Sequence, residues 1–392
     1  MSTATYFPAV EDIIKASKVL EEILEPTPFK KNDSLSELFD AQVFLKREDL
    51  QMVRSYKIRG AYNKIRSISP DRLANGIVCA SAGNHAQGVA FSCNKLKIKG
   101  SIYMPTTTPR QKIDSVRMFG RDYVDIVLTG DTFDAANSAA IEYARQSGKT
   151  FIPPFDDQKI IEGQGTIGYE ILQQAKQPLD YIFVPIGGGG LASGIGSYIK
   201  RMSPSTKVIG VEPAGAPCMK TAIEKGEIVE LEHIDKFVDG AAVKKAGALT
   251  YEICKSVLDD IITAIDKPDM HSAILYASDH GENVAPGDIL RSVSTTPKPS
   301  EYHVPMMIWR SQQWIASNPA KHRSIDENKD LPTSADNIYY TLCDLANIHI
   351  PHHHKTRRMA VTSPSLQPHK RRLLTSDLKT IITLTSPDPH TP

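Results

Sequence analysis

The chain has 392 residues, which is room for at least two domains with a sizeable hydrophobic core. Hydrophobic residues make up 41% and charged residues 23%, as in an ordinary globular protein rather than a disordered, collagen-like or coiled-coil chain. The formal net charge is +1, so charge gives no reason to expect nucleic acid or an anionic membrane as a partner.

The five cysteines are scattered and form no Cys-x-x-Cys pair, so we predict neither a disulfide framework nor a structural metal site. No apolar run reaches the roughly 18 residues that a transmembrane helix needs. The first residues lack the basic and apolar segments of a secretory signal. These features predict a soluble, cytoplasmic protein.

Short apolar runs alternate with amphipathic stretches as far as residue 212, which indicates an α/β architecture with parallel strands. The predicted strands lie at 43–46, 76–80, 98–104, 125–128, 150–152, 181–185 and 208–212. The predicted helices lie at 55–68, 84–96, 109–119, 135–146 and 190–200.

The composition changes abruptly after Gly287. All 24 glycines lie at or before that residue, whereas eight of the 12 histidines follow it, including the run at 352–354. Tight turns and helix ends use glycine routinely, so this part of the chain is expected to follow different structural rules. We predict a divergent tail at 266–392, irregular or disordered, that is either a frame-altered continuation or a different appended region. The histidine run is interpreted as solvated rather than metal-binding.

Two turns lie where a predicted strand ends and a helix begins, which is where ligands gather in parallel sheets. The four glycines at 187–190 remove every side chain from the second turn, so its backbone N–H groups can converge on an anion. The same cluster could serve only close helix–strand packing, and the residues leave both interpretations open. The polar turn at 81–88 carries more polar groups than a helix N-cap requires. Lys57 lies early in a predicted helix, where most lysines are solvated but some form Schiff bases.

In this order, three segments resemble the fold type II pyridoxal-phosphate enzymes, and most of all the threonine dehydratases. They are Ser-Tyr-Lys-Ile-Arg-Gly-Ala at 55–61, Ser-Ala-Gly-Asn-His-Ala-Gln-Gly at 81–88 and Gly-Gly-Gly-Gly-Leu at 187–191. The resemblance runs from about residue 10 to about residue 265. It implies a catalytic region with a two-domain, tryptophan-synthase-β-like fold, in which a small domain at about 45–150 is inserted in the large one.

The resemblance also implies a role for each segment. Lys57 is expected to hold pyridoxal 5'-phosphate as a Schiff base and to act as the catalytic base. Asn84 is expected at the ring hydroxyl of the cofactor. The expected phosphate contacts are Gly187, Gly188, Gly189, Gly190 and Leu191. The substrate carboxylate is expected at Ser81, Ala82, Gly83, Asn84 and His85.

The implied reaction is the α,β-elimination of L-threonine to 2-oxobutanoate and ammonia, for isoleucine biosynthesis or threonine breakdown, with L-serine giving pyruvate as a side activity. The family also leads us to expect a homo-oligomer of two or four subunits. Serine racemases are similar around the lysine, but they have a second serine where this chain has Ala82 and an acid where it has Cys218. Both differences favour elimination, and with Glu212 alone the divalent-metal site of the racemases is incomplete, so we expect no metal.

The expected pattern is lost after Ile262. The family's Ser-Gly-Gly-Asn turn, whose serine meets the pyridine nitrogen, is not found, and 283–287 is at most a distorted echo of another family segment. The partner of the pyridine nitrogen is therefore unidentified. A catalytically impaired, cofactor-binding remnant is the alternative to an active enzyme.

Overall fold

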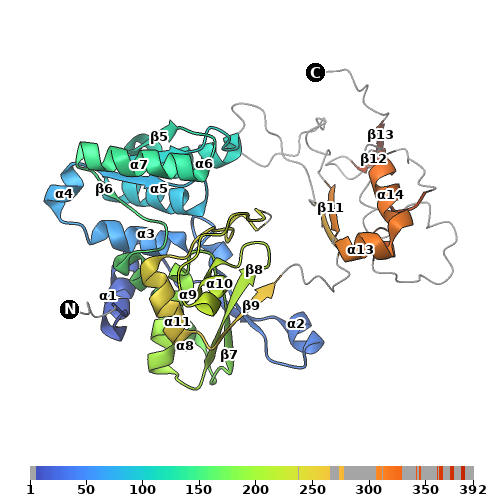
Figure 1. Cartoon of the computed structure of the whole chain (residues 1–392), viewed down its shortest axis with the longest axis horizontal. Helices are drawn as coiled ribbons and strands as arrows, with labels where there is room; N and C mark the ends of the chain where they lie inside the picture. The colour runs from blue at the N-terminus through green and yellow to red at the C-terminus, as the bar shows by residue number, and fades with distance from the viewer. Residues whose placement is uncertain are drawn as a thin grey trace. The chain divides into compact units, whose positions relative to one another are not determined.

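The computed structural model of the chain divides into two compact units, residues 1–265 and 266–392 (Figure 1). It describes residues 6–236, 238–264, 273–277, 306–310, 312–328, 341, 344–345, 360, 362–364, 371–374 and 381–384. Within these ranges, no helix is both long and apolar enough to cross a membrane.

The first unit contains two parallel sheets. Its strands are β1 (Phe29–Lys31), β2 (Phe44–Lys46), β3 (Ile77–Ala80), β4 (Gly100–Met104), β5 (Val124–Leu128), β6 (Thr150–Phe151), β7 (Tyr181–Pro185), β8 (Lys207–Pro213) and β9 (Asp260–Ala264). One sheet has the order β5-β4-β3-β6 and the other β7-β8-β9, and all neighbours in both are parallel. Strands β1 and β2 form a separate antiparallel pair. The α/β architecture with parallel strands is thereby confirmed.

Helices connect the strands of both sheets. The helices of the first unit are α1 (Val10–Leu20), α2 (Asp33–Leu38), α3 (Lys57–Arg66), α4 (Pro70–Ala74), α5 (Asn84–Leu96), α6 (Arg110–Gly120), α7 (Phe133–Ser147), α8 (Gln158–Gln174), α9 (Gly190–Met202), α10 (Cys218–Lys225) and α11 (Ala248–Val257), with short 3₁₀ turns η1 (Glu48–Leu50) and η2 (Arg121–Tyr123). Every predicted strand and helix is present, with ends no more than two residues from the predicted ones. The sequence patterns did not predict α1, α2, α4, α8, α10, α11, β1 and β9.

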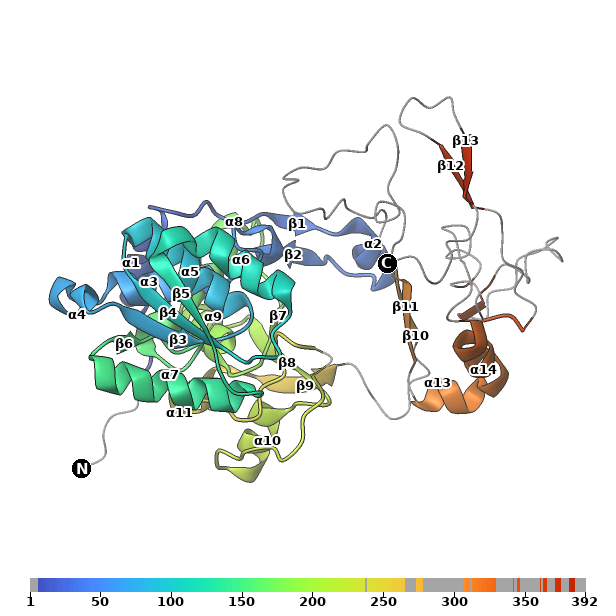
Figure 2. The ribbon, with the colours of Figure 1, turned by 90° about the horizontal axis from the view of Figure 1, so that it is seen from above.

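The sheet of β3 to β6 is covered on both faces, as a parallel sheet requires. Alternate side chains of β3 point to opposite faces. Ile77 and Cys79 pack in one apolar cluster with residues of α5 and α6, whereas Val78 and Ala80 pack in another with residues of α7. Figure 2 shows the two layers, with α5 and α6 on one side of the strands and α7 on the other.

Helix α8 lies in the middle of the first unit, and glycines let it pack closely on both sides. A Cβ at Gly163 would lie 2.7 Å from the Cα of Gly60 in α3. A Cβ at Gly165 would lie 3.0 Å from the carbonyl oxygen of Gly194 in α9. Because neither glycine carries a side chain, α8 fits between α3 and α9 and joins the halves that contain the two sheets.

The sheet of β7 to β9 is covered differently on its two faces. Ile182 and Val184 are buried in the apolar core with residues of α8, α9, α10 and α11. Their neighbours along the strand, Tyr181 and Phe183, are 53% and 61% exposed and stack on each other, and Ile262 of β9 is 41% exposed. Large apolar side chains are therefore exposed on one face of a parallel sheet, where burial is the rule.

The second unit has a small apolar cluster of its own. Its described elements are β10 (Ala273–Ala277), β11 (Met306–Arg310), α13 (Gln312–Ser317), α14 (Pro319–Asn328), β12 (Arg371–Leu374) and β13 (Ile381–Leu384). Strands β10 and β11 pair antiparallel, as do β12 and β13. Trp314, Ile325 and Leu345 form the buried cluster. The described residues of this part, which the sequence predicts to be irregular, thus include regular elements. The histidine run at 352–354 and the segment 283–287 lie outside the described residues.

Candidate active site

Lys57 is the first residue of α3, and its side chain is half-buried. The Nζ atom donates a hydrogen bond to the carbonyl oxygen of Pro154 at 3.1 Å and lies 5.4 Å from the ring centroid of Tyr56. The helix begins here because residues 51–56 form turns and bends that end in the N-cap Tyr56. The amine therefore has a defined position inside the first unit, unlike most lysines at helix starts.

The tetraglycine turn follows β7 and leads into α9. Gly189 is the N-cap of α9 and has a φ of +93°, a left-handed conformation that side chains disfavour. A Cβ at Gly188 would lie 2.4 Å from the ring of Phe155, and one at Gly190 would lie 2.9 Å from the Cβ of the same residue. Any larger residue at these positions would collide with Phe155. The turn is thus a cradle lined by backbone at a helix N-terminus, which is an arrangement suited to an anion.

Leu191 follows the glycines as the second residue of α9. Its side chain is 7% exposed and packs in the apolar core of the three-stranded sheet β7-β8-β9. What Leu191 can offer to an anion in the cradle is therefore its backbone N–H group, at the positive end of the helix dipole.

The turn at 81–85 follows β3 and leads into α5, which begins at Asn84. The backbone N–H of Gly83 donates to the Oγ of Ser81 at 3.1 Å, which closes a tight polar turn. Asn84 is exposed, whereas Ser81, Ala82 and Gly83 are half-buried. The turn thus presents accessible groups at a second helix N-terminus.

His85 is buried behind this turn. Its Nε2 lies 3.0 Å from the carbonyl oxygen of Ile152, and because a carbonyl only accepts, Nε2 carries the proton. Burial and the nearby positive charge of Lys57 lower the pKa of His85 to about 3. The imidazole is therefore neutral at physiological pH and acts here as a fixed hydrogen-bond donor.

The segment 152–157 joins these parts, although the sequence patterns did not assign it to the site. Ile152 accepts from His85, Pro154 accepts from Lys57, and the ring of Phe155 packs against the tetraglycine turn. Pro154, which binds the amine of Lys57, and Phe155, which packs on the cradle, are therefore neighbours in the chain. The signal available in the sequence was the pair of prolines directly after a predicted strand, since such a pair ends regular structure.

Gly88 brings the turn at 81–88 close to Lys57. A Cβ at Gly88 would lie 3.0 Å from the backbone nitrogen of Ile58 and 3.2 Å from the carbonyl carbon of Lys57. The first turns of α5 and α3 therefore touch through their backbones. These two predicted segments therefore adjoin each other, and the segment 152–157 contacts both of them and the tetraglycine turn.

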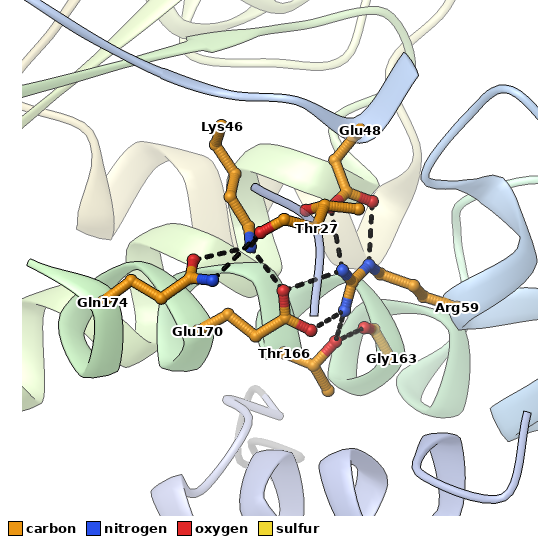
Figure 3. Close-up of polar contacts among 8 residues, drawn as sticks. All are labelled: Thr27, Lys46, Glu48, Arg59, Gly163, Thr166, Glu170 and Gln174. Atoms are coloured by element: carbon orange, nitrogen blue, oxygen red, sulfur yellow. Dashed lines mark hydrogen bonds and ion pairs between the residues drawn. The ribbon is translucent and has the colours of Figure 1, made fainter. Parts of the chain in front are cut away.

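A buried cluster of charges connects α3 to neighbouring elements (Figure 3). Arg59 donates to both oxygens of Glu48 at 2.8 Å and to the two oxygens of Glu170 at 2.6 and 3.0 Å. Lys46 Nζ lies 2.5 Å from Glu170. Burial alone would raise the pKa of Glu170, but hydrogen bonds and charge from Arg59 and Lys46 hold it below its usual value. The cluster ties the helix that carries Lys57 to α8 and η1.

Glu212 and Cys218 stand at the positions that correspond to the divalent-metal site of serine racemases. The carboxylate of Glu212 is buried and accepts from the N–H groups of Met219 and Lys220, each at 2.8 Å. Burial raises its pKa to about 7. The thiol of Cys218 lies 3.8 Å from the same carboxylate. Among the described residues, no group of three or more His, Cys, Asp or Glu side chains is placed to hold a metal ion.

Comparisons with known proteins agree with this geometry. The family described as pyridoxal-phosphate dependent enzyme matches residues 20–286. The chain is 58% identical over 253 residues to the L-threonine dehydratase biosynthetic IlvA of Halalkalibacterium halodurans, and the match covers 64% of this chain. The chain spans only 61% of the length of that curated relative.

Solved structures resemble the first two thirds of the chain. The processed form of threonine deaminase isoform 2 from Solanum lycopersicum is 40% identical with a TM-score of 0.62, over 66% of this chain and 76% of that one. Maize serine racemase is 28% identical with a TM-score of 0.63, over 66% and 77% of the two chains. A different family, described as sulfatase, matches residues 255–348.

Proposed function

Since the chain belongs to the family of pyridoxal-phosphate dependent enzymes, we propose that it converts L-threonine to 2-oxobutanoate and ammonia by α,β-elimination. Two relatives support this substrate, because they are named threonine dehydratase and threonine deaminase. The single observation that carries the proposal is the position of Lys57. Its amine binds the carbonyl of Pro154, and the next residue, Phe155, packs on the tetraglycine turn.

The residues of the site fit a phosphate-bearing aldehyde. The cradle at 187–190 has no side chains, and any Cβ at Gly188 or Gly190 would collide with Phe155. A dianion in this cradle would meet backbone N–H groups and the helix dipole of α9. Lys57 supplies the amine that would hold the aldehyde covalently. When bound, pyridoxal phosphate supplies an electron-withdrawing ring that stabilises negative charge at the substrate Cα.

Lys57 has a second role in this proposal, as the general base. Once free, its amine would take the proton from the substrate Cα. The carbonyl of Pro154 accepts a hydrogen bond from the amine and so orients its lone pair.

The substrate carboxylate is assigned to the turn at 81–85. Its backbone N–H groups and the N-terminus of α5 favour a negative charge there. His85 is neutral and holds the start of α5 against the segment at Ile152, so it positions the turn without adding charge. Asn84 is exposed at the first position of α5, and we assign it to the hydroxyl of the cofactor ring.

Elimination is favoured over racemisation at this site. Ala82 has no proton to deliver to the second face of the substrate Cα, whereas serine racemases use a serine there. Glu212 is satisfied by two backbone N–H groups, and Cys218 is a poor ligand for a hard divalent cation. Serine racemase stays the second candidate because the maize enzyme has a similar fold. Formation of D-serine from L-serine, with no release of 2-oxobutanoate from L-threonine, would select it.

A cofactor-binding remnant without turnover is the other candidate. The exposed side chains of Tyr181, Phe183 and Ile262 favour it, because within the described part of the chain one face of the three-stranded sheet lacks the cover that parallel sheets have. The curated relative also extends well beyond the matched region. Cofactor binding without threonine turnover would identify a remnant.

The deciding experiment uses the purified full-length chain incubated with pyridoxal phosphate. Reduction with borohydride should fix the cofactor to Lys57, as peptide mass spectrometry can show, and L-threonine should give 2-oxobutanoate. The Lys57→Ala variant should lose both signals, whereas Lys95→Ala, at an exposed lysine of α5, should keep them. Undiminished 2-oxobutanoate production by Lys57→Ala would refute the proposal.

The second unit is proposed to be a different appended region rather than a frame-altered continuation. The match of the sulfatase family to residues 255–348 supports this, because a shifted reading frame yields arbitrary sequence. Within the first unit, we propose that residues at about 45–150 form the small domain inserted in the large one. Resequencing of the segment that codes for residues 260–392, together with an intact mass, tests the appended origin.

We also propose a cytoplasmic homo-oligomer of two or four subunits. The cysteines of the described part, Cys79, Cys93, Cys218 and Cys254, are free and buried, which suits a reducing compartment. Light scattering after size-exclusion chromatography measures the subunit number, and a monomer would contradict the proposal. The biosynthetic names of the relatives support a place in isoleucine biosynthesis.

A further inference from the structure

Three consecutive backbone carbonyls of the tetraglycine turn each meet a side-chain donor. The pairs are Cys218 Sγ to Gly187 O at 3.5 Å, Thr250 Oγ1 to Gly188 O at 2.6 Å and Cys254 Sγ to Gly189 O at 3.7 Å. The three donors are buried, and they come from two helices, α10 and α11. Thr250 and Cys254 are four residues apart and therefore lie on one face of α11.

Donors behind the carbonyls fix the direction of the N–H groups in front. In a planar trans peptide unit the C=O and N–H bonds point in opposite directions. A side chain that binds the C=O of Gly188 therefore also sets the N–H of Gly189. Glycine has more backbone freedom than any other residue, so four in a row would otherwise make the turn poorly defined.

Thr250 is itself held in place by Asp156. The carboxylate of Asp156 accepts hydrogen bonds from the backbone N–H groups of Ala248, Leu249 and Thr250, each at 3.0 Å. Asp156 thus caps the first turn of α11 and adjoins Phe155, which packs on the other side of the turn. The hydroxyl of Thr250 is also 3.3 Å from the carbonyl of Gly247, but the contact with Gly188 is much shorter.

The two thiols stay protonated and can donate. Burial raises the pKa of both Cys218 and Cys254 to about 12. Thiols are weak donors, so the hydroxyl of Thr250 makes the strongest of the three contacts.

We propose that Thr250, assisted by Cys218 and Cys254, is a positioning residue that directs the N–H groups of the tetraglycine turn toward the phosphate of the cofactor. This inference rests on the proposed function, because it assigns the turn to that phosphate. It predicts that loss of the hydroxyl weakens phosphate recognition specifically, while covalent capture by Lys57 persists.

The test compares two ligands that differ only in the phosphate. Dissociation constants of pyridoxal phosphate and of pyridoxal are measured on the full-length chain by spectroscopic titration. In Thr250→Val, affinity for pyridoxal phosphate should fall about fivefold, the effect of one lost hydrogen bond, and affinity for pyridoxal should not change. Thr250→Ser keeps the hydroxyl and should restore the ratio of the two constants to its original value.

Thr206→Val is the matched control. Thr206 is equally buried, and its hydroxyl donates to the carbonyl of Leu179 at 2.7 Å, next to the start of β8 rather than at the tetraglycine turn. This variant should lose stability but keep the ratio of the two dissociation constants. If Thr250→Val does not fold, Cys254→Ala should shift the ratio in the same direction by about twofold, since its thiol is the weaker donor.

The outcomes separate this inference from the proposed function. A chain that binds pyridoxal phosphate at Lys57, but whose Thr250→Val and Cys254→Ala variants keep the original ratio, would overturn only the positioning role. An equal loss for both ligands would also overturn it, because the effect would then be general. A wild-type chain that shows no borohydride-trapped adduct at Lys57 would overturn both.

Discussion

Removal of the guanidinium of Arg59 tests the buried charge cluster most directly. Its side chain is 1% exposed, and those of its partners Glu48 and Glu170 are 13% and 11% exposed. The substitution Arg59→Met keeps the bulk but removes five hydrogen bonds, four of them to the carboxylates of Glu48 and Glu170 and one to Thr166. Breaking a buried ion pair by removing one partner costs about 3–5 kcal/mol, so we expect a loss of that size in unfolding free energy at pH 7.

The loss should depend on pH in a defined direction. In the wild type, the pKa of Glu170 is held below its usual value, so its stabilising contribution is present above the unfolded pKa and is lost as pH falls through the folded pKa. In Arg59→Met only Lys46 still lowers the pKa of Glu170, so this carboxylate takes up a proton at a higher pH than in the wild type. The deficit of the variant relative to the wild type should therefore be largest near pH 7 and smaller near pH 5.

Urea unfolding followed by far-UV circular dichroism measures this deficit. Both tryptophans, Trp309 and Trp314, belong to the second unit, so their fluorescence should report that unit and stay unchanged. Arg66→Met is the control on the same helix, because Arg66 is 53% exposed and lies 3.7 Å from Glu22, and it should cost less than about 1 kcal/mol. A loss below about 1 kcal/mol for Arg59→Met, or a deficit that does not shrink in acid, would refute the reasoning.

Three further predictions concern other parts of the chain. Burial raises the pKa of Glu212 to about 7, so its ionisation destabilises the fold, and the free energy of unfolding should fall by at most about 3 kcal/mol as pH rises from about 4.5 to 7. Glu212→Gln should flatten this pH dependence in urea titrations, and an unchanged pH dependence would contradict the assignment. Gly188→Ala should lower the free energy of unfolding by about 1–3 kcal/mol and also weaken pyridoxal phosphate binding, because the new Cβ would lie 2.4 Å from the ring of Phe155. The double variant with Phe155→Leu should regain part of the stability. Trp314→Ala should remove about 3 kcal/mol or more from the second unit, as followed by Trp309 fluorescence, and leave cofactor binding intact; loss of cofactor binding would show that the two units depend on each other.

Local patterns in the sequence predicted seven strands of the first unit, five of its helices and the three segments of the site. Buried parallel strands are short apolar runs, and 77–80 shows this in four adjacent buried residues. The tetraglycine turn was visible for a similar reason, since four glycines in a row are a local signal. Helix α8 was missed because Gly163, Gly165 and Gly168 lower helix propensity, although they are the residues that let α3 and α9 approach it.

The sequence alone determined which residues could take part in the chemistry, because Lys57, the turn at 81–85 and the glycines are recognisable by type and order. Only the tertiary structure decided how they are held. Asp156 and Thr250 are 94 residues apart and meet next to the tetraglycine turn, while Arg59 and Glu170 are 111 apart and meet between α3 and α8. Such pairs leave no local periodicity, since their hydrogen bonds form only after the helices pack and exclude water.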